Sequence, residues 1–313
     1  MNTPNVNLFF ACDDGYIPFL AVTLTSIKEN KANNRIYDVK ILNTGICEEY
    51  KKRLTDALAD DSFKIEFVDI SDSVAKISDK LHTRDYYSKT TYFRLFIPEL
   101  YPEIDKALYL DCDVVLCADV AELFDVELKD NLVGAISDGF VKCVSRLHDY
   151  VTERIGVHKP VDYFNAGVLL MNLKEMRESD FGGRFIDLLG KITFDVAQDQ
   201  DYLNVLCNGR RVTIGTEWNA MPGFCSDTEQ KKLIHFNLDS KPWHKDEVEF
   251  SDIFWKYSDI SCFAKEIREI KENYTEEEKS EGETKSLIDV AEEQGRDDKK
   301  NEEIRQMLAS IWM

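Results

Sequence analysis

Two aspartates, Asp111 and Asp113, flank a single cysteine inside an otherwise apolar run, Lys106–Leu116. Residues two apart on an extended strand point to the same face, so both carboxylates are predicted to aim at one spot. Two neighbouring anions in an apolar segment are costly unless a cation or hydrogen-bond donors offset them. Oxygen ligands suit Mg²⁺ or Mn²⁺, which usually share their coordination with substrate phosphates. The pair therefore indicates a metal–diphosphate site at the end of a buried strand, although aspartates are also common in turns.

Further segments are polar where a core segment should not be. Arg94 lies inside an aromatic, helix-like stretch, and Asn165 opens an apolar strand followed by two small residues. Acids and amides are concentrated in Gln198–Asn204, and His235 precedes the segment Lys241–His244. Each feature has an ordinary structural explanation: an ion pair, a turn residue, a helix cap or a buried core histidine. Their occurrence together, in this order, indicates a site.

Short apolar runs alternate with segments of helical periodicity along the first half of the chain. The β-α-β-α-β order predicts an open α/β sheet with parallel strands and right-handed crossovers. Strands are expected at Val6–Ala11, Val39–Leu42, Lys64–Val68, Ala107–Leu110, Val133–Ile136 and Val168–Met171, and helices at Ile17–Lys28, Glu48–Ala59, Phe181–Leu189 and Tyr202–Cys207.

In such a sheet, ligands collect beyond the carboxyl ends of the strands. Asp13 and Asp111 each follow a strand-like run almost at once, so both are expected on the same rim. The sequence contains neither G-x-G-x-x-G nor G-x-x-x-x-G-K-[ST], which argues against a dinucleotide oxidoreductase or a P-loop NTPase.

The balance of charge restricts the partners. The chain has 313 residues, 43% of them hydrophobic, and a formal net charge of -20. It can bury one large core or two modest ones, and it should be repelled by nucleic acids and by anionic membranes. A phosphorylated substrate would need a local cation, which agrees with a bound metal.

No signal peptide or membrane span is expected, because the N-terminus lacks a basic region and no long apolar run follows it. The cysteines are scattered and form no C-x-x-C pair, so free thiols in a reducing cytoplasm are expected. They stand at positions 12, 47, 112, 117, 143, 207, 225 and 262.

The composition changes after about Tyr274. The stretch Thr275–Ser286 has no large apolar residue, and a solvated linker or loose helix outside the core is expected. A later stripe at helical spacing has three explanations: a helix that packs back on the domain, a docking element for a partner or a second copy, or, third, membrane binding. The stripe consists of Ile304, Met307, Leu308, Ile311 and Trp312.

Taken together, these motifs resemble the family 8 retaining glycosyltransferases, which include bacterial lipopolysaccharide galactosyl- and glucosyltransferases and glycogenin. The resemblance runs from about residue 5 to residue 260. It implies the GT-A fold, a Rossmann-like open mixed sheet flanked by helices, as a catalytic domain over 1–262 with an acidic helical extension over 263–313. The matching segments are Phe10–Tyr16, Thr91–Leu95, Leu108–Asp113, Tyr163–Asn172, Asp199–Asp201, His235 and Lys241–His244.

The resemblance also implies a UDP-sugar donor and Mn²⁺, with Mg²⁺ as the other candidate. By this resemblance Asp111, Asp113 and His235 bind the metal, and Lys241 contacts the diphosphate. Ala11 and Asp13 match positions that hold the uracil and ribose. Around the donor sugar, the matching residues are Arg94, Asn165, Asp199 and Gln200. The expected donor-binding set also contains Cys12, Tyr16, Cys112, Ala166 and Leu238. Two positions depart from the family pattern: Gly15, where Asn is frequent, and Leu238, where Gly is frequent.

The predicted activity is transfer of glucose or galactose from a UDP-sugar to a saccharide acceptor, such as a glycan or a lipopolysaccharide-type saccharide, with retention. The family pattern places an amide, Gln200, where a nucleophile would sit, which favours a front-face substitution. Two alternatives stay open: a hydrolase or nucleotidyltransferase that uses the same metal site, and a binding or scaffold protein. The expected location is the cytoplasm, peripheral to a membrane through the acceptor, and a homo-oligomer through the C-terminal helix is a further prediction.

Overall fold

The structure, a computed structural model, describes residues 5–32, 34–75, 89–224, 230–275 and 282–312. The chain divides into two compact units. The first unit is built from Met1–Val74, Ala107–Glu127 and Gly215–Ser280, and the second from Ala75–Lys106, Leu128–Ile214 and Glu281–Met313. Each unit therefore combines segments that are far apart in the sequence.

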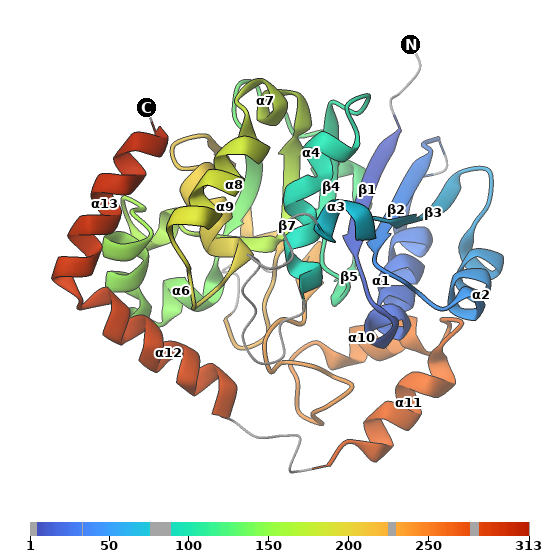
Figure 1. Ribbon diagram of the computed structural model, residues 1–313. Helices are drawn as coiled ribbons and strands as arrows, with labels where there is room; N and C mark the ends of the chain where they lie inside the picture. Colours follow the sequence, from blue (N-terminus) through green and yellow to red (C-terminus); the bar gives the residue numbers. More distant parts are fainter. Residues whose placement is uncertain (1–4, 33, 76–88, 225–229, 276–281, 313) are drawn as a thin grey trace. The chain divides into compact units, whose positions relative to one another are not determined.

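The first unit has a parallel sheet in the strand order β3-β2-β1-β4. The central strand β1 pairs with β2 on one side and with β4 on the other, and it is almost wholly buried and apolar. This is the pattern of a parallel strand covered on both faces. The helices α1 and α2 connect these strands, as the alternating pattern predicts (Figure 1). The bounds are β1 Val6–Ala11, α1 Ile17–Asn30, β2 Tyr37–Asn43, α2 Glu48–Leu58, β3 Phe63–Asp69 and β4 Lys106–Leu110.

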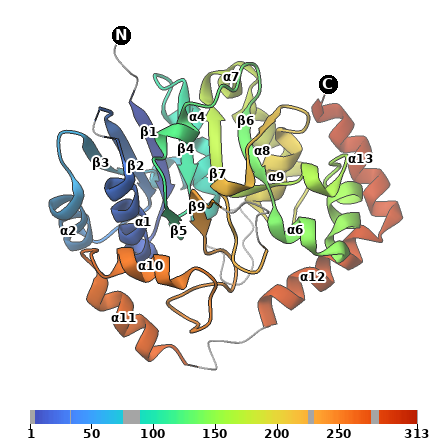
Figure 2. The same cartoon turned by 180° about the vertical axis from the view of Figure 1, so that it is seen from behind.

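A second, two-stranded antiparallel sheet of this unit joins β5 to β9, and Figure 2 shows the two strands side by side. The strand predicted at Ala107–Leu110 is confirmed as β4, and the apolar residues after the turn at Asp111–Asp113 form the separate strand β5. The remaining elements of the unit include short and longer helices. Their bounds are α3 Ser71–Ala75, β5 Val114–Leu116, α5 Ala121–Phe124, β9 Leu233–His235, α10 Ser251–Ser258 and α11 Ala264–Asn273.

The second unit has a mixed sheet, in which β6 pairs antiparallel with β7 and parallel with β8. Tyr202 of α9 packs among aromatic rings from neighbouring elements, with Phe194 at 4.9 Å and Phe185 at 5.6 Å between ring centroids. This aromatic core holds the start of α9 in place. The bounds are the 3-10 helix η3 Lys89–Phe96, α4 Ile97–Leu100, β6 Val133–Ser137, α6 Gly139–Cys143, β7 Phe164–Asn172, α7 Leu173–Glu178, α8 Phe181–Lys191, α9 Asp199–Leu206 and β8 Arg211–Thr213.

The last two helices, α12 (Gly282–Gly295) and α13 (Asp298–Trp312), belong to the second unit. They contact the π-helix η5, Tyr150–Arg154, in the segment drawn green beside them in Figure 1. Of the apolar stripe, Ile304 and Leu308 are buried, as expected for a helix that packs back on its own chain. The side chains of Ile311 and Trp312 lie outside the described residues. The division of the chain at residue 262 stays a prediction.

The predicted strands and helices of the first half are confirmed, with ends that differ by a few residues. Seven of the eight cysteines are free thiols, and Cys225 lies outside the described residues. Within the described part of the chain, no helix has both the length and the hydrophobicity needed to cross a membrane.

Candidate active site

The turn between β4 and β5 presents the two predicted aspartates. Asp111 follows β4 and Asp113 precedes β5, so a turn, and not the alternation of one strand, brings their carboxylates together. The buried Thr23 of α1 braces this turn, since its hydroxyl lies 2.9 Å from the carbonyl oxygen of Cys112 and 2.7 Å from that of Val114. A buried hydroxyl on α1 thereby satisfies backbone acceptors of the turn.

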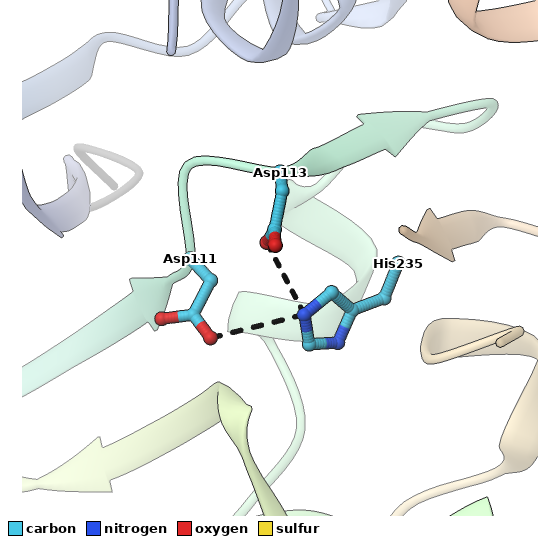
Figure 3. A group of neighbouring side chains, drawn as sticks. All are labelled: Asp111, Asp113 and His235. Carbon is cyan, nitrogen blue, oxygen red and sulfur yellow. Dashed lines mark ion pairs between the residues drawn. The ribbon is translucent and has the colours of Figure 1, made fainter. Parts of the chain in front are cut away.

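His235 meets these aspartates from β9, where the antiparallel pairing sets it opposite Val114 (Figure 3). Its Nε2 lies 3.2 Å from Oδ1 of Asp113 and 3.8 Å from Oδ2 of Asp111. One ligand atom from each of the three residues lies within 4.8 Å of the others. The three predicted metal ligands therefore form one cluster.

The chemistry of this cluster fits a divalent cation. Nδ1 of His235 lies 3.0 Å from the amide oxygen of Asn219, which accepts, so Nδ1 is placed to donate there and Nε2 is the ring nitrogen left to bind an ion. Nε2 faces two carboxylates, and in the part of the chain that the structure describes the buried Oδ1 of Asp113 has no hydrogen-bond partner. Two carboxylates and an imidazole nitrogen that face one another suit a bound positive charge. Asp111, Asp113 and His235 would hold the ion, and the imidazole favours Mn²⁺ over Mg²⁺.

Lys241 supplies a fixed positive charge at the same place. Its buried ammonium is ion-paired with Asp113 and lies 2.6 Å from the carbonyl oxygen of Phe236. Burial alone would raise the pKa of Asp113, but Lys241 and His235 outweigh it and hold that pKa well below its usual range. Asp113 is therefore ionised at neutral pH.

Most of the residues predicted to hold the nucleotide lie at or just after the end of β1. Cys112 donates through its thiol to the carbonyl oxygen of Ala11 at 3.2 Å, so the ends of β1 and β4 meet as expected. Asp13 caps the following turn by accepting from the backbone N–H of Tyr16 at 3.2 Å. Leu238 adopts a φ of 47°, the left-handed conformation that favours glycine. The loop thus keeps a glycine-type backbone although leucine occupies the position.

The predicted donor-sugar residues form a second cluster, which lies within the second unit. Arg94 from η3 makes a buried ion pair with Asp199 at 3.0 Å, where Asp199 opens α9. The Arg94 guanidinium also donates to the carbonyl oxygens of Thr91, at 2.9 Å, and of Ala166. Three elements, η3, β7 and α9, are therefore joined through one cation.

Gln200 is the second residue of this cluster that links separate elements through hydrogen bonds. Its Oε1 accepts from the backbone N–H of Ala166 at 2.8 Å and from the amide of Asn165 at 3.3 Å. Its Nε2 donates to Asp138 at 3.1 Å, and Asn165 donates to the same carboxylate oxygen at 3.1 Å. The carboxamide of Gln200 is therefore held in one orientation by groups on β7 and at the end of β6.

Asp201 anchors the first turn of α9 from within the core. It is fully buried and accepts from the hydroxyls of Tyr150 and Tyr163 at 2.7 and 2.6 Å and from the N–H of Ala197 at 2.9 Å. Burial raises the pKa of Asp201 to about 6, although these hydrogen bonds lower it. Its contacts fix the backbone that carries Asp199 and Gln200.

Two residues of these clusters were missed in the sequence. Asp138 directly follows the strand-like run that ends near Ile136, as Asp13 and Asp111 follow theirs, so the rule applied to those two would have found it. Asn219 carries no local signal, because its role depends on a contact with His235 sixteen positions away. The structure thus collects the predicted residues in two groups, one in each unit.

Comparison with known proteins decides the family. The model of glycosyl transferase family 8 matches residues 7–247. The chain belongs to this family. A putative glycosyltransferase of Haemophilus influenzae is 30% identical over 253 residues, covering 77% of this chain and 73% of that protein. The lipopolysaccharide 1,2-glucosyltransferase of Escherichia coli is 27% identical over 298 residues, covering 86% and 84%.

Solved family 8 relatives agree with the expected fold. The galactosyltransferase LgtC, in complex with donor and acceptor sugar analogs, has a TM-score of 0.70 and 26% identity, covering 85% of this chain and 100% of that one. The bifunctional glycosyltransferase WbbM has a TM-score of 0.74 and 27% identity, covering 85% of this chain and 51% of that one. The predicted α/β GT-A fold is confirmed.

Proposed function

We propose that this family 8 protein is a metal-dependent retaining hexosyltransferase that moves glucose or galactose from a UDP-sugar to a saccharide acceptor. The observation that carries the proposal is the cluster of Asp111, Asp113 and His235, whose lone pairs converge where a divalent ion would sit. Mn²⁺ or Mg²⁺ bound there would act as a Lewis acid on the leaving diphosphate.

The protein's own charges support the same reaction. As the bond between sugar and phosphate breaks, negative charge grows on UDP, and the buried ammonium of Lys241 would stabilise it electrostatically. Ala11, Cys12, Asp13, Tyr16 and Cys112, with Leu238, are the residues proposed to hold the nucleotide.

The second cluster is proposed to act on the hexose. Asp199 would orient sugar hydroxyls while its buried ion pair with Arg94 holds the carboxylate in place. Gln200, with Asn165 and Ala166, would present a dipole to the positive charge that develops at the anomeric carbon. Because its Oε1 already accepts two hydrogen bonds, the Gln200 amide is a poor nucleophile. A front-face substitution, in which the departing phosphate oxygen takes the proton of the acceptor, accounts for retention without a covalent intermediate.

The acceptor is proposed to be a saccharide because the similar proteins named above include a lipopolysaccharide glucosyltransferase and a galactosyltransferase solved with an acceptor sugar analog. The proposed place of action is the cytoplasm, next to a membrane that carries the acceptor.

Thermal denaturation with a panel of UDP-sugars, each with and without Mn²⁺, tests the proposal. A specific donor should raise the melting temperature by mass action, and only when the metal is present. Proton NMR of the product then reports the anomeric configuration, and retention is expected. Absence of a shift with every UDP-sugar and Mn²⁺ would contradict the proposed donor. Release of free hexose at the same rate with and without saccharide acceptors would instead identify a hydrolase.

A further inference from the structure

Gln198 precedes the donor-sugar residues Asp199 and Gln200 and has an unusual backbone. Its φ of 45° and ψ of −114° lie outside the α, β and left-handed regions that residues with a side chain normally occupy. Such a conformation is energetically unfavourable and persists mainly at functional sites. The strain lies on the N-cap residue, directly before the helix α9.

The environment of the Gln198 side chain is also unfavourable. Only 2% of the residue is exposed, and among the described residues neither Oε1 nor Nε2 has a hydrogen-bond partner. The start of α9 does not need this amide, because the backbone carbonyl of Gln198 itself accepts from the N–H groups of Asp201 and Tyr202 at 3.1 and 3.3 Å. A buried amide without partners is costly, and leucine would fill a similar volume without that cost.

The strained backbone and the buried, unpartnered amide of Gln198 both destabilise the free protein, which indicates that this residue has a function. Its position next to the proposed donor-sugar residues indicates what that function is. The next two residues along the chain carry the groups proposed to act on the hexose: Asp199, paired with Arg94, and Gln200, held by Asn165 and Ala166. A carboxamide offers one acceptor and two donor hydrogens, which matches neighbouring hydroxyl groups of a hexose.

We propose that the Gln198 carboxamide binds hydroxyl groups of the donor hexose and contributes to the choice of sugar. In the free protein the amide is covered and unpaired, and a rotation of the side chain toward the bound hexose gives it partners. The hydrogen bonds between this amide and the hexose then offset the free-energy cost of burying the amide without partners in the free protein. This inference rests on the proposed UDP-sugar donor.

The experiment compares wild type with Gln198→Leu and Gln198→Gly, using Gln306→Leu at an exposed position of α13 as the matched control. Melting temperatures are measured for the full chain with Mn²⁺ alone, with UDP, with UDP-glucose and with UDP-galactose. The leucine variant removes the polar atoms and keeps the backbone strain, whereas the glycine variant relieves both.

Without ligand, Gln198→Leu should melt about 1–3 °C above wild type, because an unpaired buried amide is lost. Both Gln198 variants should keep the wild-type shift with UDP, since the proposed nucleotide residues are unchanged. The additional shift that a UDP-hexose produces over UDP should fall, corresponding to a loss of about tenfold in affinity. Gln306→Leu should behave as wild type throughout.

The inference is overturned if, in the Gln198 variants, a UDP-hexose raises the melting temperature over that with UDP by as much as it does in wild type. It is also overturned if Gln198→Leu melts below wild type or does not fold, since the amide would then have a structural role. If wild type itself shows no shift with UDP or any UDP-hexose, the proposed function fails, and that outcome is separate from either result on Gln198.

Discussion

Nδ1 of His235 lies 3.0 Å from Oδ1 of Asn219, and this contact determines which ring nitrogen faces Asp111 and Asp113. The backbone keeps the pair together, because the N–H of His235 donates to the carbonyl oxygen of Ala220 at 2.9 Å. Asn219 thus orients the ring of His235, a residue that we propose binds the metal.

Asn219→Leu is expected to weaken Mn²⁺ binding about 10–100-fold, the usual effect of removing a group that orients a histidine ligand. Isothermal titration of Mn²⁺ in the presence of UDP measures it, with Asn273→Leu at an exposed position of α11 as the control. Unchanged affinity would mean that His235 needs no such orientation.

Asp113→Asn should abolish metal-dependent UDP binding, because a charged ligand is lost. The variant should also be less stable, since the buried ammonium of Lys241 loses its ion-pair partner. The double variant Asp113→Asn with Lys241→Met should recover stability in chemical denaturation but not Mn²⁺-dependent UDP binding. If the double variant recovered both stability and Mn²⁺-dependent UDP binding, Asp113 would not be a metal ligand.

Gln200→Ala should lower kcat about 100-fold with little change in the affinity for UDP, because the role proposed for this amide arises in the transition state. Steady-state kinetics, with a UDP-sugar that shifts the melting temperature, measure kcat, and titration with UDP measures the affinity for the nucleotide. Unchanged turnover would remove Gln200 from the catalytic residues, and a glycosyl group trapped on an aspartate would contradict the front-face substitution.

The raised pKa of Asp201, about 6, predicts a pH dependence of stability. Between pH 4 and pH 6 the folded chain holds this proton more tightly than the unfolded chain, so the contribution of Asp201 to stability falls as the pH rises through that range. Asp201→Asn should remove this decrease in stability with rising pH. The difference in the free energy of unfolding between variant and wild type should therefore change by roughly 1–3 kcal/mol between pH 4 and pH 6.5. Urea unfolding across this range measures it, and the exposed Asp187→Asn should leave the slope unaltered.

Leu308 is fully buried on α13, so Leu308→Ala should destabilise the protein by about 2–5 kcal/mol. Gln306→Ala, on the exposed side of the same helix, should cost less than about 0.5 kcal/mol. Equal midpoints in urea would show that the C-terminal helix does not pack against its own chain in solution.

Local patterns in the sequence were sufficient for much of the fold. The strand at Val6–Ala11 and the helix that begins at Ile17 were predicted because hydrophobic periodicity is a property of neighbouring residues. The aspartates after the ends of β1 and β4 were found for the same reason, since a polar residue directly after an apolar strand is visible in the sequence.

The tertiary structure decided the rest. It showed that a turn, and not an extended strand, brings Asp111 and Asp113 together, and that Thr23 of α1 donates to the carbonyl groups of Cys112 and Val114 in and after this turn. It also joined Asn219 to His235 and Asp138 to Gln200. Each of these contacts links segments far apart in sequence, so it depends on how distant elements pack and not on the residues beside each group.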